Sequence, residues 1–422
     1  MSALADQKRL AAEALLSALP VPMEEASWAH DTRARARTRL LDAGAPIKRD
    51  EYWRYTDPSA LTTPLALAEA SEETPAPTGF GVDAIQVRFV NGCFRADLSD
   101  ALTLDGAAIA VLGDTLKQDI SIARELYGNL EAAGQEKVSR PLAILNTAAA
   151  TEGLVIQATG NAGALHLRSD LVGEGAAMLR HLVRVEKGAE VTVLESGPAT
   201  NTVMEVDIAE GGSFHHIRLQ SGERAASASH IFARIGSEAS FKSFTLTADG
   251  EMTRNEVVMD LTGADAVGHV GGAVLAQGAS HVDNTIFVTH SNLNGESRQV
   301  FKNVMAGKAR SIFQGKIFVR EGAQKTDGYQ ISQAVLLNDG AEFSAKPELE
   351  IYADDVACSH GSTTGALDPT AMFYLQSRGV PRAEAEAMLI AAFADEAIAE
   401  IEDEALADAM RAEVANWMAN RD

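Results

Sequence analysis

Two side chains near the C-terminus could do chemistry together. Cys358 and His360 lie in the stretch Tyr352–Gly361, YADDVACSHG. On an extended strand, residues at i and i+2 point to the same face, so the thiol and the imidazole would stand side by side. Sulfur and imidazole nitrogen are ligands that suit iron, zinc or a sulfide cluster, and an imidazolium also stabilises a neighbouring thiolate. The spacing therefore predicts a metal- or cluster-related pair, provided that the segment is a strand.

This pair is too small to be a complete metal site. Structural zinc takes four ligands, and iron–sulfur clusters are usually held by four thiolates. The only other cysteine, Cys93, lies far earlier in the chain and belongs to no motif, so we interpret it as a buried or incidental thiol. Cys358 and His360 are therefore either inert or completed by a second chain.

Familiar catalytic motifs are missing from the sequence. No G-x-x-x-x-G-K-[ST] phosphate-binding loop occurs, so the chain is not expected to hydrolyse ATP itself. The motifs G-x-S-x-G, H-E-x-x-H and C-x-x-C are absent too. We predict a protein that is not an enzyme and has no catalytic residues. The adjacent His215 and His216 would point to opposite faces of a strand, and we interpret them as surface residues without a chemical role.

The Cys–His pair falls within a strand-rich region that we place at residues 151–365. Short β-branched runs with period-2 alternation follow one another there, such as VTVLES, FKSFTLTA and TIFVTH. Between Leu142 and Lys346 the only proline is Pro198, as expected for strands that are hydrogen-bonded on both sides. Glycine-containing turns separate the runs at irregular spacing, whereas hairpin turns would recur about every 8–12 residues. The pattern favours a parallel β-helix over a β-sandwich.

The flanking regions differ from this core. Residues 1–80 are predicted to form an N-terminal helical region and a linker, because Leu65–Thr78 is acidic and then proline-rich. Residues 81–150 are predicted to be a mixed α/β connecting region, and residues 366–422 a C-terminal helical domain. The C-terminal helices are strongly acidic, which fits either a solvated face or a docking surface for a basic partner.

The composition disfavours several kinds of partner. The 422 residues carry a net charge of −23, which disfavours nucleic acid and anionic membranes. No apolar run of about 18 residues occurs, so no membrane span is predicted, and the charged N-terminus argues against a signal peptide. Two cysteines form no disulfide framework and fit a reducing compartment. We therefore expect a cytoplasmic protein.

Several short sequences together resemble the SufB/SufD family of iron–sulfur cluster assembly proteins. The sharpest similarity lies in the C-terminal quarter of the chain, and the C-S-H-G core at Cys358–Gly361 is typical of the SufD branch. The matching residues are Glu51–Asp57, Lys325–Gly328, Lys346–Ile351, Tyr352–Gly361, Gly365, Asp368, Phe373–Leu375 and Ser377–Gly379.

This resemblance implies a mainly β fold class, with a right-handed parallel β-helix core flanked by N-terminal and C-terminal helical regions. It also implies pairing with a SufB-like subunit through the β-helix. A SufC-like ATPase would bind the C-terminal helices, and the residues that match the start of this region are Tyr374, Arg378, Gly379 and Pro381.

The same resemblance places Cys358 and His360 at the SufB-like interface. Iron or a nascent iron–sulfur cluster would be shared there transiently, and none would be bound stably by this chain alone. Reduced flavin is associated with such complexes, but the sequence has no flavin fingerprint and we assign it no residues. In isolation the chain is expected to form a homodimer through the β-helix.

Three hypotheses thus compete. The first is a scaffold subunit that supports de novo cluster formation and iron handling. The second is a β-helix enzyme acting on polysaccharide, which would use carboxylates along a groove. The third is a self-assembling structural solenoid, which would need neither Cys358 nor His360.

Overall fold

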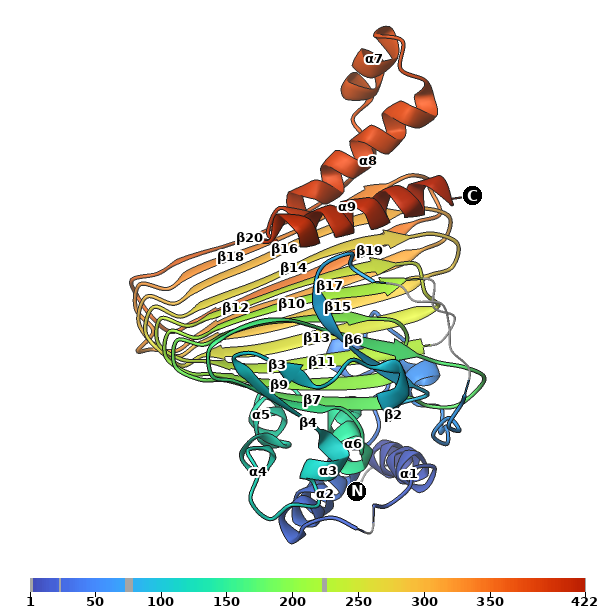
Figure 1. Cartoon of the computed structure of the whole chain (residues 1–422). Coiled ribbons are helices and arrows are strands. Elements are labelled where there is room, and N and C mark those ends of the chain that lie inside the picture. Colours follow the sequence, from blue (N-terminus) through green and yellow to red (C-terminus); the bar gives the residue numbers. More distant parts are fainter. Residues whose placement is uncertain (1–2, 23, 73–78, 222–225, 422) are drawn as a thin grey trace.

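The computed structural model describes residues 3–22, 24–72, 79–221 and 226–421. Its centre is a flattened β-solenoid made of two ten-stranded sheets, with helices at both ends (Figure 1). This confirms the predicted fold class, a mainly β parallel solenoid between helical regions. Residues 73–78 of the predicted linker lie outside the described residues.

Consecutive strands of the solenoid alternate between the two sheets, so each turn adds one strand to each sheet. Sheet 1 runs in the order β2 (Cys93–Phe94), β1 (Ala84–Val90), β6 (Asn161–Asp170), β8 (Glu190–Ser196), β10 (Ser213–Ser221), β12 (Ser240–Ala248), β14 (Val267–Ala276), β16 (Glu296–Met305), β18 (Asp327–Leu336), β20 (Ala357–Gly365). Sheet 2 runs in the order β19 (Glu342–Ile351), β17 (Arg310–Val319), β15 (His281–His290), β13 (Met252–Leu261), β11 (Ala226–Ile235), β9 (Asn201–Ile208), β7 (Met178–Val185), β5 (Leu154–Ala158), β4 (Ala107–Val111), β3 (Thr103–Leu104).

The core lies between the sheets and follows from the period-2 alternation. Every second side chain of a strand points inward, and the parallel register stacks it on its counterpart one turn away. Phe214 on β10 is paired with Val191 on β8 and with Phe241 on β12. The two phenylalanine rings are stacked with centroids 5.6 Å apart, and both are fully buried. Columns of this kind make one continuous apolar core along the solenoid.

The two ends of the solenoid are different. At the N-terminal end, β1–β2 and β3–β4 are antiparallel pairs, and the outermost strands β2 and β3 have two residues each. At the C-terminal end, the outermost strands are β19 with ten residues and β20 with nine. Within the described parts of the chain, each of these two strands is paired on one side only. We call this end the open edge.

Helices cover the outer faces of both sheets. The N-terminal layer packs on sheet 2 and contains α1 (Ala3–Ser17), α2 (Ser27–Ala43), η1 (Glu51–Trp53), η2 (Pro58–Leu61), α3 (Leu112–Thr115), α4 (Ala123–Leu126), α5 (Asn129–Ala133), α6 (Pro141–Ala149). A short 3-10 turn, η3 (Ala96–Leu98), follows β2. The C-terminal helices are α7 (Pro369–Ser377), α8 (Arg382–Ile398), α9 (Glu404–Ala419).

The C-terminal helices have two parts. The second half of α8 and all of α9 pack on the outer face of sheet 1, where Ile390, Ala394 and Trp417 are buried. In contrast, α7 has no buried residue. It projects beyond the open edge together with the first half of α8 (Figure 1). We call this projecting part the arm.

Candidate functional site

Both predicted site residues, Cys358 and His360, lie on β20 at the open edge. Strand β20 pairs with β18 in a parallel register. The backbone amide of Ala357 donates to the carbonyl of Thr326 at 2.8 Å. In a parallel ladder, alternate residues face the same neighbour, so the odd-numbered residues of β20 bond to β18. The backbone N–H and C=O groups of Cys358 and His360 therefore face the open edge.

The side chains of Cys358 and His360 share the inward face of β20. Their partners in register are Gly328 and Gln330, which are both buried. The Cys358 thiol is half-buried and packs against an apolar cluster that includes Ile317, whereas His360 is exposed. Burial raises the pKa of the Cys358 thiol, and a hydrogen bond from the Gly328 backbone opposes this effect only in part. The site thus consists of a mainly protonated thiol beside an accessible imidazole.

The ligand set of this site is incomplete within one chain. Among the described residues, no group of three or more His, Cys, Asp or Glu side chains could hold a metal ion. Cys93 is half-buried on β2, and burial raises the pKa of its thiol. Because β2 and β20 are the two outermost strands of sheet 1, nine strand spacings separate the cysteines. At about 4.8 Å for each spacing, they are roughly 40 Å apart and cannot share a ligand.

The two strands of the open edge differ in their capacity to pair. On β19, the amide of Glu342 donates to the carbonyl of Ala309 at 3.0 Å, so the odd-numbered residues face the open edge. Pro347 is one of them, and it has no N–H to offer. The sequence of β20, ACSHGSTTG, contains neither proline nor lysine. Strand β20 therefore presents an unbroken row of backbone donors and acceptors, and β19 does not.

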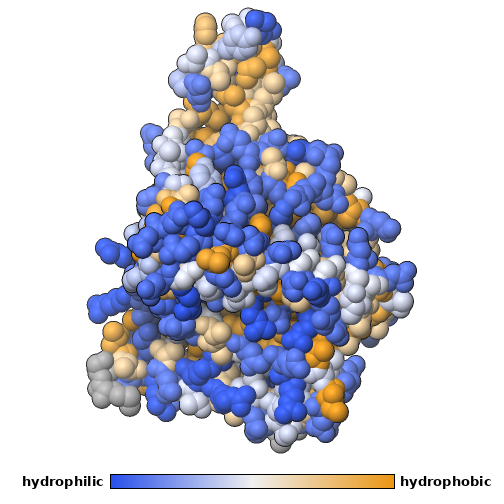
Figure 2. All heavy atoms as spheres, turned by 90° about the vertical axis from the view of Figure 1, so that its left-hand side faces the viewer, coloured by the Kyte–Doolittle hydropathy of each residue, from blue (hydrophilic) through white to orange (hydrophobic). Residues whose placement is uncertain are grey.

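The arm carries the other predicted site residues. Tyr374 lies on α7, and Arg378 follows the helix with its guanidinium carbon 4.9 Å from the Tyr374 ring centre. Gly379 ends α7 in the left-handed conformation with φ of 88°, where a side chain would be strained, and Pro381 is the N-cap of α8. Phe373 and Tyr374 are 72% and 55% exposed. Figure 2 shows apolar side chains gathered on this part of the molecule.

Ion pairs hold the α8–α9 turn on sheet 1. Lys302 on β16 pairs with Glu396 of α8, and Lys242 on β12 pairs with Glu402 in the turn. The His215 Nε2 atom lies 3.7 Å from a carboxylate oxygen of Glu402. Part of the acidic charge on the C-terminal helices is therefore used within the chain, and the arm begins from an anchored base.

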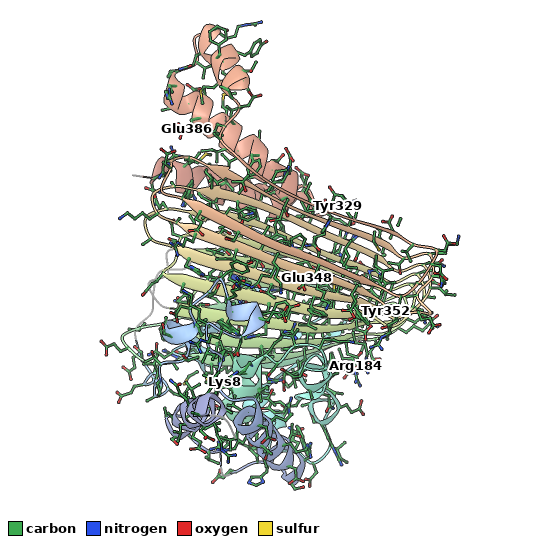
Figure 3. All side chains as sticks on the ribbon, turned by 180° about the vertical axis from the view of Figure 1, so that it is seen from behind. Lys8, Arg184, Tyr329, Glu348, Tyr352 and Glu386 are labelled. Atoms are coloured by element: carbon green, nitrogen blue, oxygen red, sulfur yellow. The ribbon has the colours of Figure 1, made fainter. Side chains whose placement is uncertain are left out.

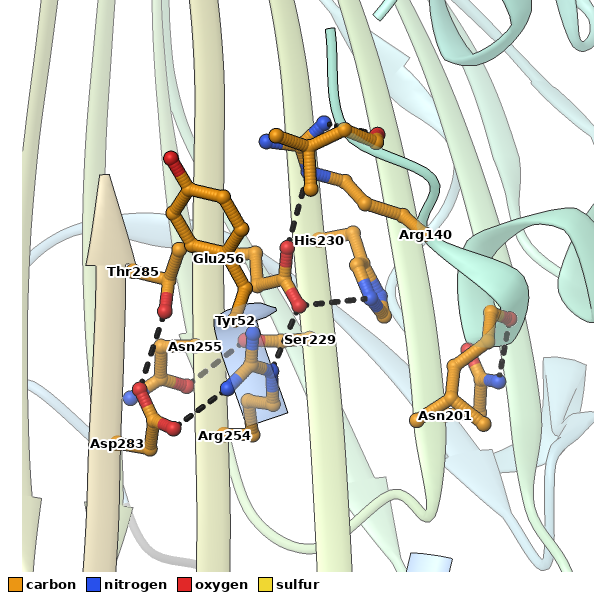
Figure 4. A network of polar contacts seen from close by, with 12 residues as sticks. Tyr52, Arg140, Asn201, Ser229, His230, Arg254, Asn255, Glu256, Asp283 and Thr285 are labelled. Atoms are coloured by element: carbon orange, nitrogen blue, oxygen red, sulfur yellow. Dashed lines mark hydrogen bonds and ion pairs between the residues drawn. The ribbon is translucent and has the colours of Figure 1, made fainter. Parts of the chain in front are cut away.

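A buried ion network lies under the N-terminal segment, and the sequence did not reveal it (Figure 4). Arg254 on β13 donates to Glu256 at 2.7 Å and to Asp283 at 2.5 Å, and all three side chains are buried. Trp53 covers the network, with its ring centre 4.0 Å from the Arg254 guanidinium carbon. Thr56 donates to Asp283 at 2.5 Å. The EYWRYTD segment thus seals charged groups against sheet 2.

The same segment also holds β19. The Tyr52 hydroxyl donates to Glu348 at 2.7 Å, and Lys346 donates to Glu51 at 2.9 Å. Glu348 lies on the face of sheet 2 next to the N-terminal 3-10 helices (Figure 3). We call Glu51–Trp53 the strap, because it fastens an edge strand of the solenoid to the N-terminal layer.

One interpretation of the sequence was wrong. His215 and His216 do point to opposite faces of β10, but His216 is fully buried inside the solenoid and is not a surface residue. Its Nε2 atom lies 2.7 Å from Glu195, and its Nδ1 atom lies 2.9 Å from the Ser243 hydroxyl. Because the residue is enclosed, we interpret this arrangement as a satisfied polar contact in the core.

The parallel solenoid thus carries a half-buried thiol and an exposed imidazole on a strand whose outer edge has no strand partner among the described residues. A family model described as "SUF system FeS cluster assembly, SufBD core domain" matches residues 168–393, which is more than half of the chain. The chain belongs to this SufBD family and has a role in iron–sulfur cluster assembly.

Individual relatives agree with this assignment. The chain is 28% identical to the iron–sulfur cluster assembly protein SufD of Escherichia coli over 87% of this chain and 88% of the relative. It is 30% identical to an iron–sulfur cluster assembly SufBD family protein of Synechocystis over 84% of each chain. It is 33% identical to SufD of Bacillus subtilis over 35% of this chain and 34% of that protein. In the described part of the chain, no helix has the length and apolar character that a bilayer crossing requires.

Proposed function

We propose that this chain is a SufD-type scaffold subunit that pairs with a SufB-like subunit through β20 and binds a SufC-like ATPase through the arm. Cys358 and His360 present a thiol and an imidazole at the subunit boundary, where iron or a nascent cluster is held transiently as cargo. The chain supports de novo cluster formation and iron handling by holding these parts together, and not by turnover of its own.

The observation that carries this proposal is the unbroken edge of β20 beside an incomplete ligand set. An added strand would bond to the backbone of Cys358 and His360, so it would bring its own side chains next to theirs. A second subunit that pairs here thus supplies both the missing backbone partners and the missing ligands. A β-helix enzyme acting on polysaccharide finds no support in the family to which the chain belongs.

The ATPase-binding role is proposed for the arm because of its surface chemistry. Exposed aromatic residues and arginine are the types that contribute most binding energy at protein interfaces. Phe373 and Tyr374 lie on a helix with no buried residue, and Arg378 directly follows this helix. The arm is attached to sheet 1 through its base, so force on the arm would reach the solenoid.

A pair of proline variants tests the β20 assignment. Ser362→Pro removes an N–H that faces the open edge and costs no bond between β18 and β20. Ala345→Pro removes the corresponding N–H on β19, where Pro347 already interrupts the edge. Each variant is co-expressed with SufB-like and SufC-like chains and analysed by gel filtration. We expect Ser362→Pro to lose the complex and Ala345→Pro to keep it.

Retention of the complex by Ser362→Pro would contradict pairing through β20. The cargo role is tested separately by anaerobic reconstitution of the complex and visible absorbance, with wild type compared to His360→Ala. A lower cluster absorbance in an intact complex is expected, and an unchanged absorbance would contradict a role for His360.

Two further proposals accompany this function. When isolated, the chain is proposed to form a homodimer in which two copies of β20 pair, since the same edge is then free. Reduced flavin on the complex remains a prediction to which we assign no residue of this chain.

A further inference from the structure

We propose that Gln330 is a positioning residue for His360. Its side-chain carbonyl, which has no partner in the structure, would accept a hydrogen bond from one ring N–H when the exposed His360 ring turns toward it, and this would leave the other ring nitrogen free to bind a metal ion. This inference rests on the proposed function of Cys358 and His360, but the orientation of the His360 ring can be measured without any metal.

The register of the last two strands in sheet 1 supports this proposal. Gln330 on β18 is the direct partner of His360 on β20, so the two side chains stand next to each other on the inward face. Gln330 is fully buried, and its Oε1 atom has no hydrogen-bond partner. On the side of the open edge, the residue paired in register with Gln330 is His360, and a neutral imidazole carries one N–H donor.

The opposite sheet fixes the direction of the Gln330 amide. Its Nε2 atom donates to the backbone carbonyl of Gly315 on β17 at 3.4 Å. A Cβ atom at Gly315 would lie 2.3 Å from this Nε2 atom, so only glycine leaves room for the amide here. Because the Nε2 atom is bonded to β17, the Oε1 atom of the same amide points away from Gly315 and has no partner.

The energetic cost of this arrangement argues against chance. A buried polar atom without a partner is destabilising, because it has lost its hydrogen bonds to water and gained none in the protein. Two neighbours of Gln330 show the same feature: both amide atoms of Gln299, one strand further in, and the hydroxyl of Ser332 lack partners. The interior of the solenoid is therefore polar where it approaches His360, although apolar columns fill most of it.

A carbonyl behind a metal-binding histidine has a known physical effect. The acceptor fixes the tautomer and the ring orientation, and its removal typically weakens metal binding by about 10–100-fold. In a half-site with two ligands, an imidazole that is already oriented reduces the ordering cost when the second subunit and the metal arrive.

The first measurement is the tautomer of His360 in the full-length protein. Long-range proton–nitrogen NMR spectra of ¹⁵N-histidine-labelled protein at a pH where the ring is neutral report it, and His360→Ala identifies the signal. We expect one dominant tautomer in the wild type and a mixture in Gln330→Met. Gly315→Ala should also produce a mixture, because it displaces the amide without changing Gln330. Gln299→Met is the matched control and should leave the signal unchanged.

A Co²⁺ titration of the complex with a SufB-like subunit then measures the effect on metal binding. In a Cys93→Ser background, the part of the thiolate-to-Co²⁺ absorption that Cys358→Ala removes reports binding at Cys358, and Gln330→Met is expected to weaken this binding about tenfold. An unchanged His360 tautomer in both Gln330→Met and Gly315→Ala would overturn the positioning role. So would an equal change in Gln299→Met, which would indicate a purely structural glutamine column. A changed tautomer with no Co²⁺ binding at Cys358 in the wild-type complex would instead count against the proposed function and leave the positioning role standing.

Discussion

Replacing Arg254 with methionine tests whether the buried ion network is essential to the N-terminal half of the molecule. The Arg254 side chain is 1% exposed and serves both Glu256 and Asp283. Methionine fills a similar volume but leaves the buried Asp283 carboxylate without its arginine, whereas Glu256 keeps its ion pair with Arg140. Breaking a buried ion pair in this way costs about 3–5 kcal/mol. With an unfolding entropy of about 2.1 cal/mol/K per residue, the 422 residues give about 0.9 kcal/mol/K, so Tm should fall by about 3–6 °C.

Arg234→Met is the matched control, measured in the same scanning calorimetry. Arg234 lies on the neighbouring strand β11 and bonds to Asp207 at 2.7 Å and 2.8 Å, but its side chain is 51% exposed. Exposed pairs contribute about 0–1 kcal/mol, so Tm should fall by no more than about 1 °C. If Arg254→Met lowered Tm no further than Arg234→Met, the network would be dispensable and the reasoning refuted.

The pH dependence gives an independent check of the same network. Burial raises the pKa of Glu256, but the charges of Arg254, His230 and Arg140 outweigh burial, and the pKa falls to about 2. A carboxyl whose folded pKa lies below its unfolded value of about 4.3 stabilises the protein above that pH, and this stability is lost as the pH falls toward 2. The Arg254→Met variant has less of this stability to lose as the pH falls, because one of the charges that lower the pKa of Glu256 is missing. The Tm difference between wild type and Arg254→Met should therefore be largest near pH 7 and should shrink below about pH 4.

Three other variants address the arm, the strap and the helical turn. Phe373→Ala combined with Tyr374→Ala should weaken the binding of a SufC-like ATPase at least about tenfold, without loss of stability because α7 has no buried residue; an unchanged Kd in a titration would contradict the assignment. Tyr52→Phe removes the hydrogen bond to Glu348, worth about 1 kcal/mol, and should speed amide hydrogen exchange in β19 but not in β20; equal rates in wild type and variant would argue against the strap. Glu402→Gln weakens the contact with Lys242 by less than about 1 kcal/mol, and exchange should rise in the α8–α9 turn alone.

Local patterns were sufficient to predict the fold. Period-2 alternation, scarce prolines and glycine turns indicate parallel strands buried on both faces, because each of these features reports the environment of a single strand. The shared face of Cys358 and His360 follows from their spacing in the same way. The position of β20 at the end of its sheet could not be predicted, since strand order depends on where the chain stops adding turns.

Contacts between distant segments were beyond this reasoning. Arg254, Asp283 and Trp53 come from three separate parts of the sequence, and none of them belongs to a motif that names its partners. His216 was misassigned because alternation shows that neighbours face opposite ways but does not show that both faces of β10 are covered. The free carbonyl of Gln330 is likewise visible only when the register of β18 and β20 is known.

Pro347 has a consequence for the size of any assembly. A solenoid with unpaired edge strands at both ends can add copies without limit and form a fibre. Here the outermost strands at the N-terminal end have two residues each, so they offer few backbone hydrogen bonds to an added strand. At the open edge, Pro347 interrupts the row of backbone N–H groups on β19, whereas the row on β20 is complete. With β20 as the proposed pairing strand, growth by strand addition would stop at two solenoid subunits.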